Sequence, residues 1–412
     1  MKWQAAGWID IKAGEGPMLI LSFSYFLLLL SSYYIVRPLR DALAASVDAY
    51  NYLSTAVFLT MLAIAPAFGW LVSHVSRRRL LPALYLFFIA DLVAFAVSFQ
   101  RAPTSHWVGG AFYVWVTVFN LFVVSVFWSF MADIWREEQA RRLFGIIAAG
   151  GSAGGFLGPV LTRSLVPHLG ISGIALVAAL LLSGCVGCLV LLGRNVHARA
   201  ATSNEIRHGS WRGFTLLFRS ALLRGIATLV VIYSFIAMFM YIRTGRLALA
   251  EFPEIGARTR FFSQIDLWTN AFALALQLLV VGQIAKRAGG IAVLMLVGVA
   301  LALCFIPIVF FPTLAVLAAI NVVRRAMEFG LAKPARDMLY TVVDAEKKYK
   351  AKNVIDTTLY RGADMTATWM HGLLAAAGMT LSALGVLAAI LALLTVAISL
   401  SLGKEYRELG GK

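Results

Sequence analysis

The first long apolar stretch of this chain, residues 18–36, does not end where charge begins. It continues through Arg37, Arg40 and Asp41 and then resumes with small apolar residues. A charged side chain inside hydrocarbon costs about 2.5–3.5 kcal/mol on insertion scales, so such groups usually face a watery cavity or a counter-charge. On a helix, Tyr33, Arg37, Arg40 and Asp41 fall on one stripe. This pattern predicts a pathway for a charged solute.

The composition places that stretch in an integral membrane protein. Hydrophobic residues make up 60% of the 412 residues and charged residues only 14%, whereas soluble domains carry about 25% charged residues. The first stretch is too long for a signal peptide and no small-residue cleavage site precedes the Arg-Pro segment, so we expect it to remain as a membrane helix. The three cysteines lie in apolar stretches and predict neither a disulfide framework nor a zinc site. We expect no metal and no cofactor.

Stretches of about 20 apolar residues are long enough to cross a bilayer as helices, and here they form two sets of six. The first set covers residues 17–46, 50–73, 80–99, 109–132, 143–166 and 172–193. The second set covers residues 222–246, 262–284, 290–309, 312–333, 353–376 and 379–402. We predict an all-α membrane protein with twelve transmembrane helices in two six-helix bundles, at residues 1–193 and 221–412, joined by a cytoplasmic linker at 194–220.

Basic residues concentrate in alternate loops, including the linker, whereas the opposite loops hold only Arg101, Arg258 and Arg260. Because cytoplasmic loops of membrane proteins carry the excess of Lys and Arg, both termini should be cytoplasmic. The expected location is the bacterial inner membrane. The net charge of +16 then reflects topology and contact with anionic lipids, and it does not indicate a nucleic acid partner. We expect a monomer among membrane lipids.

Two segments recur at an offset of 213 residues, 69–78 after the second window and 282–290 after the eighth. Both resemble the loop motif of the major facilitator superfamily, although Ser73 and Lys286 stand where that family has aspartate. The glycine spacing of residues 145–159 is similar to that of helix 5 in the superfamily's antiporters. The resemblance implies a major facilitator fold and exchange transport. Small residues four apart also fit ordinary close packing of membrane helices.

Charged residues inside the windows are more often basic than acidic. The basic ones are Arg37, Arg40, Arg163, Arg243, Arg246, Arg324, Arg325, Lys333 and Arg361. The acidic ones are Asp41, Asp91, Asp266, Glu328 and Asp364. Arginine donates two parallel hydrogen bonds to carboxylate or phosphate oxygens, so this excess predicts an organic anion as cargo.

Helical geometry places several of these residues on shared faces. Asn321, Arg324, Arg325 and Glu328 gather on one face, and a narrow stripe runs from residue 353 to residue 371. In a two-bundle transporter the cargo site lies near the bilayer midplane between the repeats. The predicted substrate-binding residues are Tyr33, Arg37, Arg40, Arg243, Asn270, Arg324, Arg325, Lys333, Tyr360 and Arg361. The predicted coupling or gating residues are Asp41, Asp266, Glu328, Asp364 and His371.

Several of these groups also have a purely structural interpretation. Arg40 with Asp41, or Arg324 with Glu328, fits an ion pair that latches helices together. Asp91 fits a hydrogen-bond acceptor between packed helices. His371 fits either a proton relay or a histidine bonded to a neighbouring hydroxyl group, and the many aromatic rings fit nucleobase stacking as well as plain packing.

Enzyme signatures are missing from the sequence, which contains no Gly-x-x-x-x-Gly-Lys-Ser/Thr loop, no His-Glu-x-x-His helix and no Gly-x-Ser-x-Gly elbow. We therefore do not expect an enzyme, and transport would be driven by a gradient. Two other functions remain open at this point. A flippase for an anionic lipid would use the same arginines beneath an apolar cleft. A non-transporting membrane scaffold would use the charges as latches.

Four segments carry a narrower resemblance. They read YYIVRPLRDAL (33–43), ARRLFG (140–145), EFGLAKPAR (328–336) and KYKAKNVID (348–356). They are similar to the ATP/ADP translocase family of bacteria and plastids and to its shorter bacterial relatives. The resemblance implies exchange of ATP against ADP or a related pair, with basic residues holding the phosphates. The motif positions carried over are Arg37, Arg40, Asp41, Lys333 and Arg361.

Overall fold

The computed structural model describes residues 11–12, 14–74, 77–195, 217 and 220–410, and within them the chain is helical and forms no strand. They divide into two compact units. The first contains the described residues up to Ser46, those from Ala63 to 205 and those from Glu254 to Leu267; the second contains the rest. Most of the predicted linker, 194–220, lies outside the described residues. The bundle boundaries at residues 193 and 221 therefore stay a prediction.

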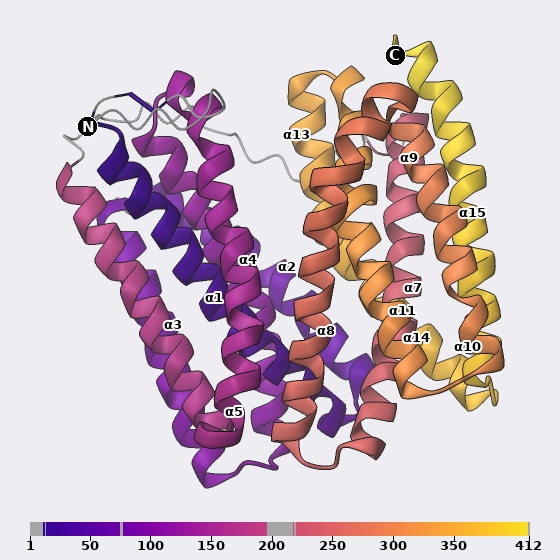
Figure 1. Ribbon diagram of the computed structural model, residues 1–412, viewed down its shortest axis with the longest axis horizontal. Helices are drawn as coiled ribbons and strands as arrows, with labels where there is room; N and C mark the ends of the chain where they lie inside the picture. The colour runs from indigo at the N-terminus through magenta and orange to yellow at the C-terminus, as the bar shows by residue number, and fades with distance from the viewer. Residues whose placement is uncertain (1–10, 13, 75–76, 196–216, 218–219, 411–412) are drawn as a thin grey trace. The chain divides into compact units, whose positions relative to one another are not determined.

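The first unit is built from long helices. They are α1 (Gly16–Val47), the second part of α2 (Tyr50–His74), α3 (Arg77–Arg101), α4 (His106–Ile134), α5 (Glu137–Asn195) and the first part of α8 (Ile255–Leu276). α3 packs along α5 (Figure 1). The predicted windows 143–166 and 172–193 both lie on α5, where Gly170 separates two helical segments with φ of 62°. Glycine reaches this left-handed conformation without the steric cost of a side chain.

α1 lies in the core of the first unit, and its buried residues are distributed around the helix. Tyr25 donates a hydrogen bond to the Tyr85 hydroxyl at 2.5 Å, and the Phe26 ring stacks on Phe127 with centroids 4.2 Å apart. Asp91 of α3 accepts a hydrogen bond of 2.8 Å from the Trp115 indole of α4. This contact confirms the interpretation of Asp91 as an acceptor between packed helices.

Glycines of α5 allow α1 to approach closely. A Cβ atom on Gly154 would lie 2.5 Å from the Leu27 carbonyl oxygen, and one on Gly158 would lie 2.5 Å from the Tyr34 Cβ. Both distances are shorter than van der Waals contact allows, so only glycine fits at these positions. The close helix approach predicted from the glycine spacing is confirmed, and it fixes the turn of α1 that precedes Arg37.

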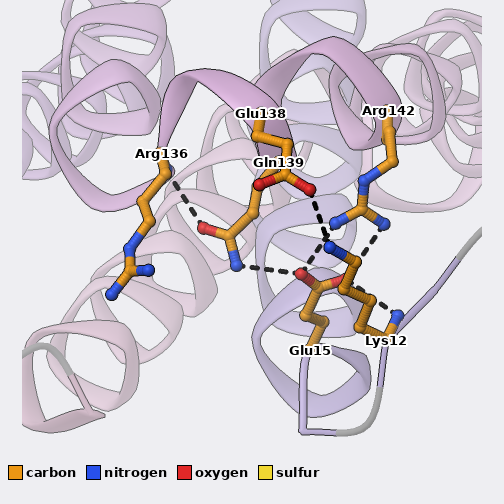
Figure 2. Close-up of polar contacts among 6 residues, drawn as sticks. All are labelled: Lys12, Glu15, Arg136, Glu138, Gln139 and Arg142. Carbon is orange, nitrogen blue, oxygen red and sulfur yellow. Dashed lines mark hydrogen bonds and ion pairs between the residues drawn. The ribbon is translucent and has the colours of Figure 1, made fainter.

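A polar network joins the start of α1 to the start of α5 (Figure 2). The Glu15 carboxylate accepts hydrogen bonds from Gln139 at 2.9 Å, from Arg142 at 3.0 Å and from the Lys12 backbone at 3.0 Å. Burial opposes ionisation of this carboxyl group, but these hydrogen bonds and the Arg142 charge outweigh it and hold the pKa of Glu15 below its ordinary value. Glu15 is thus an ionised anchor for the first helix.

The second unit contains the remaining helices. They are α7 (Ala221–Glu251), the second part of α8 (Ile255–Leu276), α9 (Gly282–Cys304), α10 (Ile306–Phe310), α11 (Leu314–Met327), α12 (Lys333–Leu339), α13 (Ala345–Val354), α14 (Tyr360–Ala376) and α15 (Leu381–Glu408). α15 packs along α9 and α7, and α14 also packs along α7 (Figure 1). The first part of α2 completes this unit.

Three π-helical turns interrupt the helices of the second unit, at Gln277–Val281, Glu328–Ala332 and Ile355–Leu359. A π turn inserts one residue into the helix and therefore rotates the face that follows by about 100°. The stripe predicted from residue 353 to residue 371 assumed an uninterrupted α-helix. In the structure Asn353 is exposed, whereas Asp364 and His371 are buried.

Within the described residues, seven helices are long and apolar enough to cross a membrane. They are Gly16–Val47, Leu80–Arg101, His106–Ile134, Glu137–Gly193, Ala221–Glu251, Gly289–Phe310 and Leu381–Glu408. Large apolar side chains such as Leu180 and Leu278 lie on the outside, as lipid contact requires. The predicted windows lie mainly on helical residues. The count of twelve spans stays a prediction.

Candidate functional site

The first unit contains a group of charged and aromatic side chains, which we call the first arginine cluster. Its members are Tyr33, Tyr34, Arg37, Arg40, Asp41, Tyr113 and Asp266. The guanidinium of Arg37 lies 3.3 Å from the Asp266 carboxylate and 5.7 Å from the centre of the Tyr34 ring. Asp266 is 1% exposed and Arg37 is 14% exposed. The ion pair is therefore nearly buried, but its cation remains reachable.

A second ion pair lies one turn further along α1. Arg40 donates from two nitrogens to one Asp41 oxygen, at 2.9 and 2.6 Å, and its guanidinium lies 5.4 Å from the centre of the Tyr113 ring of α4. Arg40 and Asp41 are neighbours in sequence. This contact joins two residues of one helix, and the tyrosine contact ties the cation to α4.

The second unit contains a comparable group, the second arginine cluster, made of Arg324, Glu328, Tyr360, Arg361 and Asp364. Arg324 donates to Glu328 at 2.8 Å, and Arg361 donates to Asp364 at 3.2 Å. The Arg361 guanidinium lies 5.2 Å from the centre of the Tyr360 ring. Glu328 belongs to a π turn and Tyr360 directly follows another. Such turns frequently lie at functional sites.

The two clusters share one arrangement of groups. In each, an arginine lies against a tyrosine ring and makes one contact of 3.2 or 3.3 Å with a carboxylate. A guanidinium has five N–H donors, and one contact of this kind uses few of them. An incoming phosphate or carboxylate can therefore bind beside the carboxylate or replace it. Both guanidiniums keep some exposure, 14% for Arg37 and 28% for Arg361.

Several predicted site residues lie apart from these groups. Arg243 donates at 2.8 Å to the Met379 carbonyl, in the turn between α14 and α15. His371 is buried against the Phe239 ring, with centroids 5.8 Å apart. Lys333 is exposed at the start of α12, and Asn270 is half-buried on α8.

Three further basic residues of the windows lie on α11, α5 and α7. Arg325 is half-buried next to Arg324, Arg163 is exposed on α5, and Arg246 pairs with Asp48 at 2.8 Å. Among the described residues, no three His, Cys, Asp or Glu side chains come together as ligands for a metal ion.

Arg258 is a residue that the sequence analysis assigned to a loop and that the structure places on α8. It is 1% exposed and is among the largest fully buried side chains of the described residues. Its guanidinium donates to the Ala42 carbonyl at 3.3 Å and to the Ser46 hydroxyl, both in the last two turns of α1. No sequence signal indicated this position, because residues 251–260 are polar and follow the end of an apolar window.

Comparisons with a family model and with curated proteins both identify transporters. The family model described as Major Facilitator Superfamily matches residues 18–332. Among curated proteins, the chain is 22% identical over 344 residues to ADP,ATP carrier protein 1 of Chlamydia muridarum, and that alignment covers 73% of this chain and 63% of the carrier. The protein of the same name from Chlamydia pneumoniae is 24% identical over 319 residues, covering 66% and 62%. The chain thus spans less than two thirds of the carriers' length.

Solved structures show the same fold at low identity. A bacterial metal transporter superposes with a TM-score of 0.63 at 13% identity, over 96% of this chain and all of that one. An auto-inhibited POT family peptide transporter gives 0.59 at 12% identity, over 95% and 97% of the two chains. A bacterial homologue of the human lysosomal transporter Spinster, in an inward-facing conformation, gives 0.54 at 10%, over 97% and 98%.

Proposed function

We propose a cargo and a mode of transport for this chain, which belongs to the major facilitator superfamily and is therefore a multi-pass membrane transporter. The cargo is an organic anion, a nucleotide or another phosphorylated metabolite, and it is exchanged by alternating access. Guanidiniums of the two arginine clusters bind its anionic groups. Asp41, Asp266, Glu328 and Asp364 hold those guanidiniums in position or take up coupling protons, and His371 is a further candidate for proton uptake.

The observation that supports this proposal best is the repeated group of tyrosine, arginine and carboxylate. Placing charges among apolar helices is costly, and a purely structural pair does not require an exposed guanidinium. Arg37 and Arg361 both keep exposed surface and both lie beside a tyrosine ring. A ring and a guanidinium side by side suit a ligand with an aromatic base and phosphates. The names of the chlamydial relatives support a nucleotide in particular.

The rest of the proposal concerns the membrane, the topology and the oligomeric state of the protein. The protein lies in the bacterial inner membrane as a monomer, with both termini and the 194–220 segment in the cytoplasm and six-helix bundles at 1–193 and 221–412. Support comes from the basic residues, which concentrate in alternate loops.

Nucleotide exchange in proteoliposomes tests the proposed identity of the cargo. Vesicles preloaded with unlabelled ADP should accumulate labelled ADP or ATP, and Arg37→Gln and Arg361→Gln should each lower the initial rate at least about tenfold, since each removes charged hydrogen bonds to the anion. Arg101→Gln, at the exposed end of α3, is the matched control and should exchange at the wild-type rate.

Two rival functions give different results in the same vesicles. A flippase would translocate a fluorescent anionic phospholipid and leave labelled nucleotides outside. A scaffold would move neither compound. If nucleotides and phosphorylated sugars all fail to exchange while the protein is folded, the anion proposal is wrong.

A further inference from the structure

α8 is attached to α1 at two points inside the first unit. Near its start, Arg258 donates to the Ala42 carbonyl and the Ser46 hydroxyl. Two turns later, Asp266 pairs with Arg37 at 3.3 Å. Residue numbers rise along α8 while they fall along α1, so the two helices run antiparallel over this stretch.

The first attachment places the Arg258 cation at the carboxyl-terminal end of α1. α1 ends at Val47, so Ala42 and Ser46 lie in its last two turns, where the Ala42 carbonyl also accepts the Ser46 hydroxyl of the same helix. The helix dipole also places negative charge there, which stabilises a buried cation. Arg258 is only 1% exposed, and a cation withdrawn so far from water must be held by such contacts. This point of attachment does not involve the proposed cargo site.

The second attachment shares a residue with the proposed cargo site. Arg37 pairs with Asp266 at 3.3 Å and is 14% exposed. An anion that binds the Arg37 guanidinium competes with Asp266 for it. Only the first thirteen residues of α8 and the residue before it belong to the first unit, because the boundary falls between Leu267 and Trp268. The rest of α8, from Trp268 to Leu276, belongs to the second unit.

From these contacts we propose that Arg258 and the Arg37–Asp266 pair form a two-point clamp that holds α8 on α1, and that an anionic cargo opens the second point by taking Arg37 from Asp266. Arg258 is a positioning residue of this clamp and does not contact the cargo. The release step rests on the proposed function, whereas the clamp itself rests on the contacts alone.

Hydrogen–deuterium exchange of the full-length protein tests the clamp through peptides that cover residues 255–267. Arg258→Met and Asp266→Asn should each speed exchange of these amides at least about tenfold, because each removes a buried charged contact that opposes local opening. Arg258→Lys, which keeps the charge, should lie between wild type and Arg258→Met. Arg260→Met, an exposed arginine on the same turns of α8, is the control and should match wild type.

A second experiment measures hydrogen–deuterium exchange of the wild-type protein after ADP or inorganic pyrophosphate is added. Either anion should speed exchange of residues 255–267 and should have no further effect in Asp266→Asn. If Arg258→Met and Asp266→Asn both exchange like Arg260→Met, the clamp does not exist. If a bound anion slows hydrogen–deuterium exchange of residues 255–267, the proposal that the cargo releases α8 from α1 is wrong. If neither anion shifts the thermal unfolding of the protein, the cargo proposal and the release step are both wrong. The exchange rates of Arg258→Met and Asp266→Asn then still show whether the clamp exists.

Discussion

Each arginine that defines the two clusters has a carboxylate within 3.3 Å. The sequence indicated the cations and the acids, and it offered Arg40 with Asp41 and Arg324 with Glu328 as pairs, but it did not indicate the pairing of Arg37 with Asp266. Arg37 and Asp266 are far apart in the chain, and no periodicity relates them. Arg324 and Glu328, by contrast, are four residues apart, so their pairing follows from helix geometry alone.

The buried Arg37–Asp266 pair gives a prediction about stability. Asp266→Leu removes the counter-charge of Arg37 and should destabilise the protein by about 3–5 kcal/mol, and Arg37→Met removes a cation from beside the buried Asp266 carboxylate and should have a similar cost. The double variant removes both charges of this pair and should recover part of the loss. Thermal unfolding in detergent measures all three. A double variant as unstable as Asp266→Leu would show that the two groups are not each other's main partners.

Glu15 gives a prediction about pH. Its pKa lies below the ordinary value because of the Gln139, Lys12 and Arg142 contacts, so its contribution to stability is complete above the ordinary glutamate pKa of about 4.3 and declines as the pH falls below that value. At pH 7, Glu15→Gln should lower stability by about 1–3 kcal/mol, since it removes the ion pair with the half-buried Arg142.

Melting curves of wild type and Glu15→Gln between pH 7 and pH 3.5 check this expectation. The difference between the two proteins should be constant down to about pH 4.5 and should shrink below it. A difference that already disappears between pH 7 and pH 6 would assign the effect to another group.

At the level of helices, most boundaries were predictable, because apolar windows follow bilayer thickness. α1 was predicted at 17–46 and is observed at Gly16–Val47. The π turns were not predictable, because nothing in a hydropathy pattern marks one inserted residue. They rotate the residues that follow them, such as Lys333 and Tyr360, away from the faces that a uniform helix would give them. Arg258 was missed for a related reason, since a polar helix start looks like a loop.

The glycines of α5 give a prediction at this scale. Gly154→Ala places a Cβ atom 2.5 Å from the Leu27 carbonyl and 2.9 Å from the Ser31 nitrogen, so α1 and α5 must separate. We expect a loss of about 1–3 kcal/mol in unfolding free energy, as for other overpacked sites.

Gly187→Ala on the same helix is the matched control, because open space surrounds that position. It should leave stability unchanged or raise it by up to about 1 kcal/mol through helix propensity. Equal effects of the two substitutions in a thermal unfolding assay would contradict the packing role of Gly154.

For the whole molecule, the predicted topology has a direct test. Trp107 is 91% exposed at the start of α4 and Glu138 is exposed at the start of α5. With cytoplasmic termini, a membrane-impermeant maleimide should label Trp107→Cys from outside and should reach Glu138→Cys only after permeabilisation. The reverse pattern would invert the topology. The native cysteines Cys185 and Cys188 are buried and should give little background.

The central claim is that guanidiniums from the two clusters bind the anionic groups of the cargo. The most direct measurement is the dissociation constant of the purified protein for adenosine, AMP and ADP, in wild type and in Arg37→Gln. Affinity should rise with each phosphate, and Arg37→Gln should weaken ADP binding about 10- to 100-fold while leaving adenosine unchanged. Equal affinities for adenosine and ADP, or an Arg37→Gln variant that binds ADP like wild type, would contradict it.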